Sequence, residues 1–165
     1  DARPVDDAPP VLTWTVTPMA PRTRVTLAAV AVPGGLGAHK WSDRRLLDAL
    51  AAATAPAQPL LVDLDGLVLE GGWSSVFAVG ADGALRTPPL DGRILPGITR
   101  ARTLAAARAL GLDVREEPLP LAALRAAREV FVTGALGIVE PAVVLDGEPL
   151  ATGPLSERLR AAVAG

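Results

Sequence analysis

The sequence predicts a mixed α/β fold with a strand-rich centre, and three features of the chain support this prediction. Short runs of β-branched and apolar residues alternate along much of its length, which is typical of strands. Asp-Gly pairs at 65–66, 82–83, 91–92 and 146–147 favour the tight turns that join neighbouring strands. Leucines and alanines at helical spacing lie between some of these runs and predict interspersed helices.

Each predicted element is bounded by residues that begin or end regular structure. The predicted strands are 11–17, 23–32, 60–62, 67–69, 75–79, 84–86, 112–115, 130–133 and 138–145. The predicted helices are 43–54, 99–110, 120–127 and 154–163. We expect Ser42 to cap the first helix, Gly111 to end the second, and Pro154 to lie in the first turn of the last.

Turn residues justify the order of the elements in the first half. The Pro-Gly-Gly sequence at 33–35 ends the strand 23–32. The next segment contains Leu46, Leu47 and Leu50, which form one apolar stripe only if the segment is helical. Two hairpins are then expected, one around Asp65-Gly66 and the next around Asp82-Gly83.

The composition limits the possible functions. The chain has 165 residues, half of them apolar, which is enough for one domain with a real core. It has no apolar run of transmembrane length and no signal-peptide pattern, so we expect a cytoplasmic protein with no membrane partner. No cysteine and a single histidine exclude thiolate and histidine-rich metal sites. A net charge of −2 gives no electrostatic reason to expect nucleic acid.

The first ten residues, DARPVDDAPP, are acidic, rich in proline and without periodicity. Such a segment is typical of a linker. We therefore expect a linker over 1–10 and a folded domain over 11–165, with the chain forming part of something longer.

Lys40 is the only lysine beside fifteen arginines, and it directly follows the only histidine, His39. Arginine has replaced lysine wherever a surface cation suffices, so the remaining lysine is a candidate for chemistry that arginine cannot perform. A partly desolvated lysine can lose its proton and attack a carbonyl, whereas arginine stays charged. The alternative is a surface lysine without a special role.

Three further motifs are candidates for a site. Glu70 ends an apolar strand before two glycines, so it either faces solvent at a sheet edge or points into a site. The sequence LPGITR at 95–100 opens a helix whose free N–H groups could bind phosphate, or it is an ordinary helix start. The sequence FVTGALG at 131–137 runs from a strand into a loop of small residues, which forms either an anion-binding loop or a tight turn.

Taken in order, HKWSDR, VLEGGWSSVF, TPPL, LPGITR and FVTGALGIVEP resemble the class IV aminotransferase family, the fold-type IV pyridoxal-phosphate enzymes. This family includes branched-chain and D-amino acid aminotransferases and 4-amino-4-deoxychorismate lyases. HKWSDR and VFVTGAL are most similar to the lyase domains. The resemblance covers about residues 11–160 and implies a large domain with a pseudo-barrel centre and flanking helices.

The resemblance also implies roles for individual residues. Lys40 corresponds to the lysine that binds pyridoxal phosphate covalently, and Glu70 to the carboxylate that pairs with the pyridine nitrogen and favours electron withdrawal into the ring. Leu95 corresponds to the apolar residue packed on the ring face. The residues that correspond to the phosphate-binding positions are Ile98, Thr99, Ala135 and Leu136.

Several positions depart from the family pattern. Ser75 stands where the family usually has asparagine, and Ala135 stands where relatives often have a hydroxyl residue. Gly137 and Ile138 replace an Arg-Gly pair that is common in lyase-like members. The smaller N-terminal domain of the family has no counterpart in the sequence.

From this resemblance we expect a 4-amino-4-deoxychorismate lyase that releases pyruvate and gives 4-aminobenzoate, a folate precursor. An aminotransferase using an amino acid and a 2-oxo acid is the alternative, and a non-catalytic remnant acting as a binding module is the second. The expected partners are a small-molecule amine substrate, the missing small domain or a partner chain, and a second copy in a homodimer.

Overall fold

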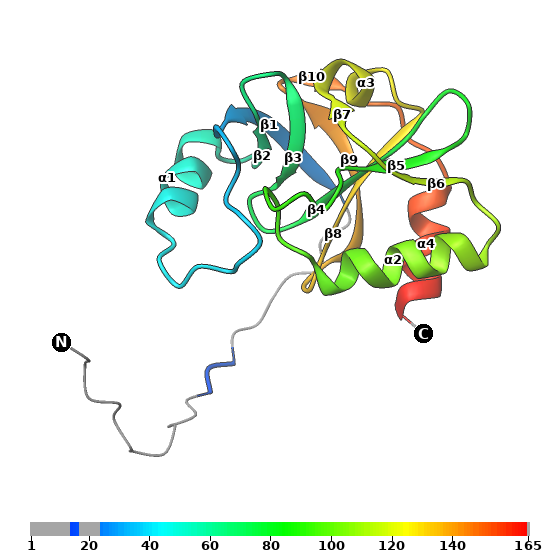
Figure 1. The fold of residues 1–165 in the computed structure, drawn as a ribbon, viewed down its shortest axis with the longest axis horizontal. Helices are drawn as coiled ribbons and strands as arrows, with labels where there is room; N and C mark the ends of the chain where they lie inside the picture. Colours follow the sequence, from blue (N-terminus) through cyan, green and yellow to red (C-terminus); the bar gives the residue numbers. More distant parts are fainter. Residues whose placement is uncertain (1–13, 17–23, 165) are drawn as a thin grey trace.

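A computed structural model describes residues 14–16 and 24–164 and confirms the mixed α/β class (Figure 1). The strands are β1 (Val25–Ala31), β2 (Gln58–Val62), β3 (Leu67–Gly71), β4 (Ser75–Val79), β5 (Leu85–Thr87), β6 (Val114–Glu116), β7 (Leu119–Pro120), β8 (Glu129–Gly134), β9 (Ile138–Leu145) and β10 (Glu148–Pro149). The helices are α1 (Arg45–Thr54), α2 (Ile98–Ala109), α3 (Leu121–Arg125) and α4 (Leu155–Ala164). The expected linker 1–10 and residues 11–13 and 17 of the expected strand 11–17 lie outside the described residues, and the described residues 14–16 do not form the expected strand.

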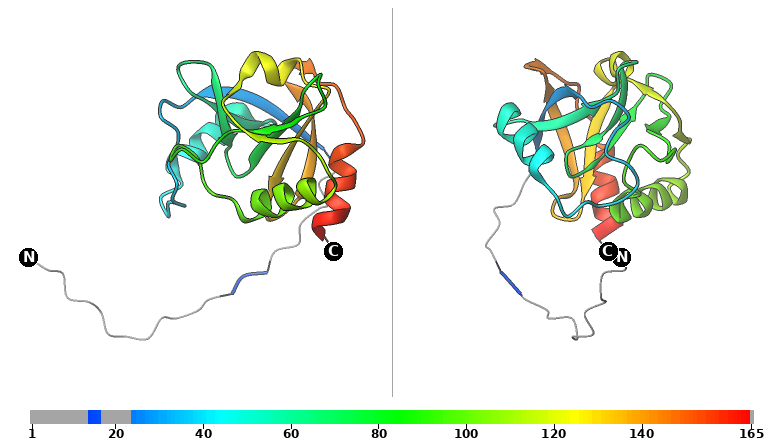
Figure 2. Two further views of the ribbon diagram at one scale, coloured as in Figure 1. Left: turned by 45° about the vertical axis from the view of Figure 1, so that its right-hand side comes forward. Right: turned by 60° about the vertical axis from the view of Figure 1, so that its left-hand side comes forward.

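All described strands belong to one curled sheet, in the order β6-β5-β4-β8-β9-β1-β2-β3-β7, with β10 beside β9. Although β3 and β4 are far apart in this order, they are consecutive in the chain and meet at a tight turn. There Gly71 and Ser74 form an isolated bridge, in which the Gly71 N–H donates to the Ser74 carbonyl at 2.7 Å. The bridge joins the adjoining ends of β3 and β4, and the curled sheet forms the pseudo-barrel centre that the family resemblance implies (Figure 2).

The apolar core has an inner and an outer part. Inside the curl, side chains such as Leu27 and Leu60 are fully buried. Outside it, α2 and α4 lie side by side over β4, β8 and β9 (Figures 1 and 2). Phe77 and Phe131 stack there with ring centroids 5.1 Å apart, next to Leu159 of α4. No helix in the described part of the chain is long and apolar enough to cross a membrane.

Most local predictions are confirmed, with small shifts at the element ends. Both Asp-Gly hairpins form, since β2 pairs with β3 and β4 pairs with β5 in antiparallel fashion. The prediction that Ser42 caps α1 is wrong. The helix begins at Arg45, and the neighbouring Asp43 accepts the Arg45 N–H at 3.1 Å and also binds its guanidinium. The short strands β7 and β10 were not predicted.

The loop after β1, which leads to Lys40, is fixed by backbone contacts with the segment before α2. The Gly37 N–H donates to the Arg93 carbonyl at 3.1 Å, and the Gly34 N–H donates to Asp63 at 3.1 Å. Arg93 itself forms an ion pair with Asp63 at 2.9 Å. Gly35 lies against the same carbonyl, where a Cβ atom would stand 2.2 Å from the oxygen. The loop can therefore approach this segment only because residue 35 has no side chain.

Replacing Gly35 by alanine should destabilise the protein much more than replacing Gly34. Both glycines have positive φ, 71° and 72°, so each substitution costs about 1 kcal/mol in backbone strain. Only Gly35→Ala adds a clash with backbone, and roughly 2 kcal/mol more is expected from overpacking, since Gly34 has open space around it. Urea unfolding of both variants measures the difference. Equal losses would show that the close approach at Gly35 is unimportant.

Candidate active site

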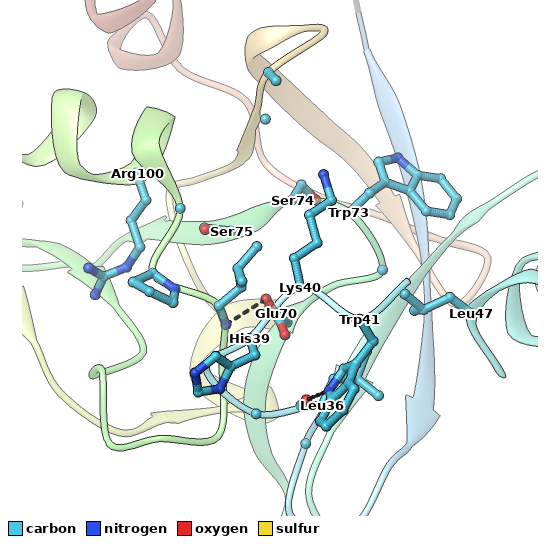
Figure 3. Close-up of a pocket in the computed structure, with 18 of the residues that line it drawn as sticks. Leu36, His39, Lys40, Trp41, Leu47, Glu70, Trp73, Ser74, Ser75 and Arg100 are labelled. Atoms are coloured by element: carbon cyan, nitrogen blue, oxygen red, sulfur yellow. Dashed lines mark hydrogen bonds between the residues drawn. The ribbon is translucent and has the colours of Figure 1, made fainter. Parts of the chain in front are cut away.

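An open cavity of about 1070 Å³ lies where four segments of the chain meet (Figure 3). The segments are the loop from β1 into α1, the β3–β4 turn, the start of α2 and the end of β8. These are the segments that contain HKWSDR, EGGWSS, LPGITR and FVTGAL. The fold therefore brings together four motifs that are well separated in the sequence.

Lys40 lies at the rim of this cavity and is exposed. Its loop is closed by Trp41, whose indole N–H donates to the Leu36 carbonyl at 2.9 Å (Figure 3). The lysine stem extends from this loop toward Ser74 and Trp73 of the β3–β4 turn (Figure 3). The described residues therefore do not supply the partial desolvation that a reactive lysine needs.

Glu70 lies in the cavity wall and is only 7% exposed. Its carboxylate accepts the Leu95 N–H at 3.2 Å, which joins the end of β3 to the segment before α2 (Figure 3). Burial raises the pKa of Glu70 to about 7, and the Leu95 hydrogen bond offsets only part of that effect. Among the described residues no cation pairs with it, so this carboxylate is suited to a positively charged group of a ligand.

The start of α2 is free to bind an anion. The helix has no side-chain cap, and the described residues offer no acceptor for the N–H groups of Ile98 and Thr99. Unpaired N–H groups and the helix dipole together favour phosphate or carboxylate. Ala135 lines the same cavity, whereas Leu136 is 66% exposed and lies outside its lining. Six of the seven predicted site residues thus share one cavity, and their functional roles remain predictions.

Sequence reasoning missed several polar residues in the lining. Arg44 is half-buried and has no ion-pair partner among the described residues. Arg100 is buried, and its guanidinium donates to the Pro88 carbonyl at 2.8 Å and to Glu116 at 3.0 Å. Thr133 is 2% exposed and has an unpaired Oγ1. Arg44 is the last residue of HKWSDR and Thr133 belongs to FVTGAL, so the motifs contained them but did not indicate which way their side chains face.

The cavity combines an amine nucleophile, a buried carboxylate without a cation, and a helix start with free N–H groups. A ligand that suits all three would carry an electrophilic carbonyl, a cationic ring nitrogen and a phosphate. The residues present therefore fit a phosphorylated pyridine aldehyde.

Comparisons with known proteins agree with this geometry. The sequence profile described as amino-transferase class IV matches residues 14–142. The branched-chain-amino-acid aminotransferase of Escherichia coli (strain K12) is 36% identical over 109 residues, covering 64% of this chain and 35% of that protein. The D-alanine aminotransferase of Bacillus licheniformis is 34% identical over 115 residues, covering 68% of this chain and 40% of that protein.

A solved structure supports the fold in the same way. A hypothetical aminotransferase from Mycobacterium tuberculosis, in its PLP-bound form, superposes with a TM-score of 0.76 at 25% sequence identity. The match covers 86% of this chain and 55% of that one. This chain thus spans less than half the length of the two curated relatives and about half of the solved structure.

The buried carboxylate should make stability depend on pH. Because the folded-state pKa of Glu70 is raised from 4.5 to about 7, its contribution is fully present below pH 4.5 and is lost as the pH rises through 7. Relative to Glu70→Gln, which does not titrate, the wild-type chain should lose about 3 kcal/mol of unfolding free energy across this range.

Urea unfolding at several pH values provides the measurement. Glu148→Gln, which removes the same charge from an exposed position in β10, is the control. A constant difference between wild type and Glu70→Gln from pH 4.5 to above 7 would contradict the raised pKa.

Proposed function

Because the chain belongs to the amino-transferase class IV family, we propose that it forms the cofactor-binding part of a pyridoxal-phosphate-dependent aminotransferase in the cytoplasm. The substrates would be an amino acid and a 2-oxo acid. The observation that carries the proposal is the meeting of the single lysine, the cation-free buried carboxylate of Glu70 and the uncapped start of α2 in one cavity.

The residues present would hold the cofactor at four points. Lys40 would bind it covalently, and Glu70 would pair with the ring nitrogen. Leu95 would pack on the ring. The phosphate would be bound by backbone N–H groups of Ile98, Thr99, Ala135 and Leu136. The loop contribution comes from backbone alone, since Ala135 and Leu136 have no hydroxyl.

Pyridoxal phosphate, when bound, supplies an electron sink for negative charge at the substrate carbon that carries the amine. With the cofactor bound, the Lys40 Nζ would be placed to take the proton from this carbon and later to return one. The carboxylate of Glu70, held in a poorly solvated wall, would favour the protonated form of the ring nitrogen. Arg44 is a suitable partner for the carboxylate of an amino acid because its guanidinium is otherwise unpaired among the described residues.

The names of the relatives support the aminotransferase better than the lyase that we expected from the sequence. The similarity of HKWSDR and VFVTGAL to lyase domains keeps 4-amino-4-deoxychorismate lyase as the second candidate. Both reactions use a base at Lys40 and a carboxylate at Glu70, so the cavity described here serves either. The substitutions at Ser75 and Gly137 favour a third possibility, a non-catalytic binding module.

We propose that the site is completed by the family's small domain or by another chain, and that the protein works as a homodimer. The exposed apolar side chains beside the cavity support this proposal. Trp41 is 64% exposed, Leu46 53% and Ile98 82%, and all three line the cavity. Such a group of exposed apolar residues is typical of a covered surface. The 165-residue chain alone should therefore bind the cofactor weakly and show little activity.

Lys40 should be the only site of covalent cofactor attachment. Protein incubated with pyridoxal phosphate should gain a visible absorption band, and borohydride reduction should fix the cofactor on the peptide that contains Lys40. Lys40→Arg should lose the band and keep its unfolding free energy, because the side chain is exposed and unpaired among the described residues. A reduced adduct at the chain's amino terminus would overturn the assignment.

Substrate consumption separates the candidate reactions. The chain, together with the small domain or partner chain that completes its site, is given 4-amino-4-deoxychorismate in one experiment, and branched-chain or D-amino acids with a 2-oxo acid in another. We expect the 2-oxo acid to be converted and the chorismate derivative to persist. Glu70→Gln should lower the turnover at least 100-fold, a typical loss when proton transfer or charge stabilisation is impaired. Release of pyruvate and 4-aminobenzoate would establish the lyase. If neither the chorismate derivative nor the amino and 2-oxo acids were consumed, the binding module would be favoured.

A further inference from the structure

The start of α2 is bordered by a pair of hydroxyl side chains to which the family resemblance assigns no role. Ser75 of β4 and Thr133 of β8 are directly opposite partners in an antiparallel pair of strands. Opposite residues project from the same face of a sheet, so the two hydroxyl groups lie close together. Both residues line the cavity, and both are buried.

Ser75 and Thr133 lie on the sheet face that is next to the first turn of α2. The pair is on the same face of the sheet as Phe77 and Phe131, the face that α2 covers. The Ser75 Oγ would be 3.0 Å from a Cβ atom at Gly97, the residue that precedes α2. The N–H groups of the first turn and the two hydroxyl groups therefore border the same part of the cavity.

The Thr133 hydroxyl is left without a partner. Its residue is 2% exposed, and no described group accepts from or donates to Oγ1. A buried hydroxyl without a partner destabilises the fold, because folding removes its hydrogen bonds to water and does not replace them. The Nε of Arg100 in the first turn of α2 is likewise buried and unpaired. Two unpaired polar groups at an uncapped helix start indicate a ligand with several acceptor oxygens.

We propose that Ser75 and Thr133 donate their hydroxyl groups to the phosphate of the cofactor and replace the hydroxyl that Ala135 lacks. The inference rests on the proposed function, since it assumes that pyridoxal phosphate binds in this cavity. A phosphate offers enough oxygens to accept from the α2 N–H groups and from both hydroxyls. The departures from the family pattern at positions 75 and 135 are then parts of one rearranged subsite.

The test compares pyridoxal phosphate with pyridoxal, which has the same ring and aldehyde but no phosphate. Dissociation constants for both are measured by absorbance titration of wild type, Thr133→Val, Thr133→Ser and Ser75→Ala. Thr133→Val keeps the shape and removes the hydroxyl, and it should weaken pyridoxal phosphate about tenfold, the effect of one hydrogen bond. Its affinity for pyridoxal should not change. Ser75→Ala should behave in the same way, and Thr133→Ser should retain the wild-type affinity.

Ser156→Ala is the matched control, because the Ser156 hydroxyl is equally buried and unpaired but lies in α4, outside the cavity lining. It should change neither affinity. Equal weakening of both ligands, or of neither, in Thr133→Val and Ser75→Ala would overturn the hydroxyl subsite and leave the proposed function intact. A wild-type protein that binds neither ligand, or that is labelled away from Lys40, would overturn the proposed function and the inference with it.

Discussion

The site depends above all on the tight turn between β3 and β4. The Gly71–Ser74 bridge joins the adjoining ends of β3 and β4, and the same turn places Glu70 on one side and Ser75 on the other. A side chain at either glycine of the turn would force its neighbours to shift, because a Cβ at Gly71 would be 2.3 Å from the Ser74 Oγ and one at Gly72 would be 2.9 Å from Pro59. The junction of β3 and β4 and the arrangement of the polar cavity wall therefore depend on the same turn.

The carboxylate at this turn is buried without a cation among the described residues. Glu70 is buried, and the only described hydrogen bond to its carboxylate comes from the Leu95 N–H. Elsewhere the chain pairs its acids readily, as where Asp63 and Asp91 share the guanidinium of Arg93. We propose that this buried acid, unpaired in a chain so rich in arginine, is kept for a cationic ligand.

The sequence predicted what local chemistry determines. The Asp146-Gly147 turn forms because both residues adopt positive φ, 52° and 83°, which this pair tolerates best. Ser42 does not cap α1 because the helix begins at Arg45, where Asp43 accepts the Arg45 N–H. The opposition of Ser75 and Thr133 follows from the pairing of strands that are distant in sequence, and no local pattern specifies that register.

The site residues divide in the same way. Local motifs were sufficient to predict Lys40, Glu70 and the start of α2 as site candidates, because each is recognisable from the few residues around it. Arg44 and Thr133 were missed because they stand out only by lacking a polar partner among the described residues. That lack can be recognised only when the neighbours of each side chain are known. Buried polar groups without partners are therefore information that only the fold can supply.

The exposure of Lys40 connects the site to the question of what completes it. A lysine acts as a free amine near neutral pH only when burial or a nearby positive charge disfavours its protonated form. The described residues leave Lys40 exposed in a cavity that is also lined by Trp41 and Trp73, two apolar side chains that are themselves partly exposed. A surface that covered this part of the cavity would also remove water from the lysine. The contact that stabilises the assembly and the one that activates the nucleophile would then be the same, which is why we propose that the isolated chain has little activity.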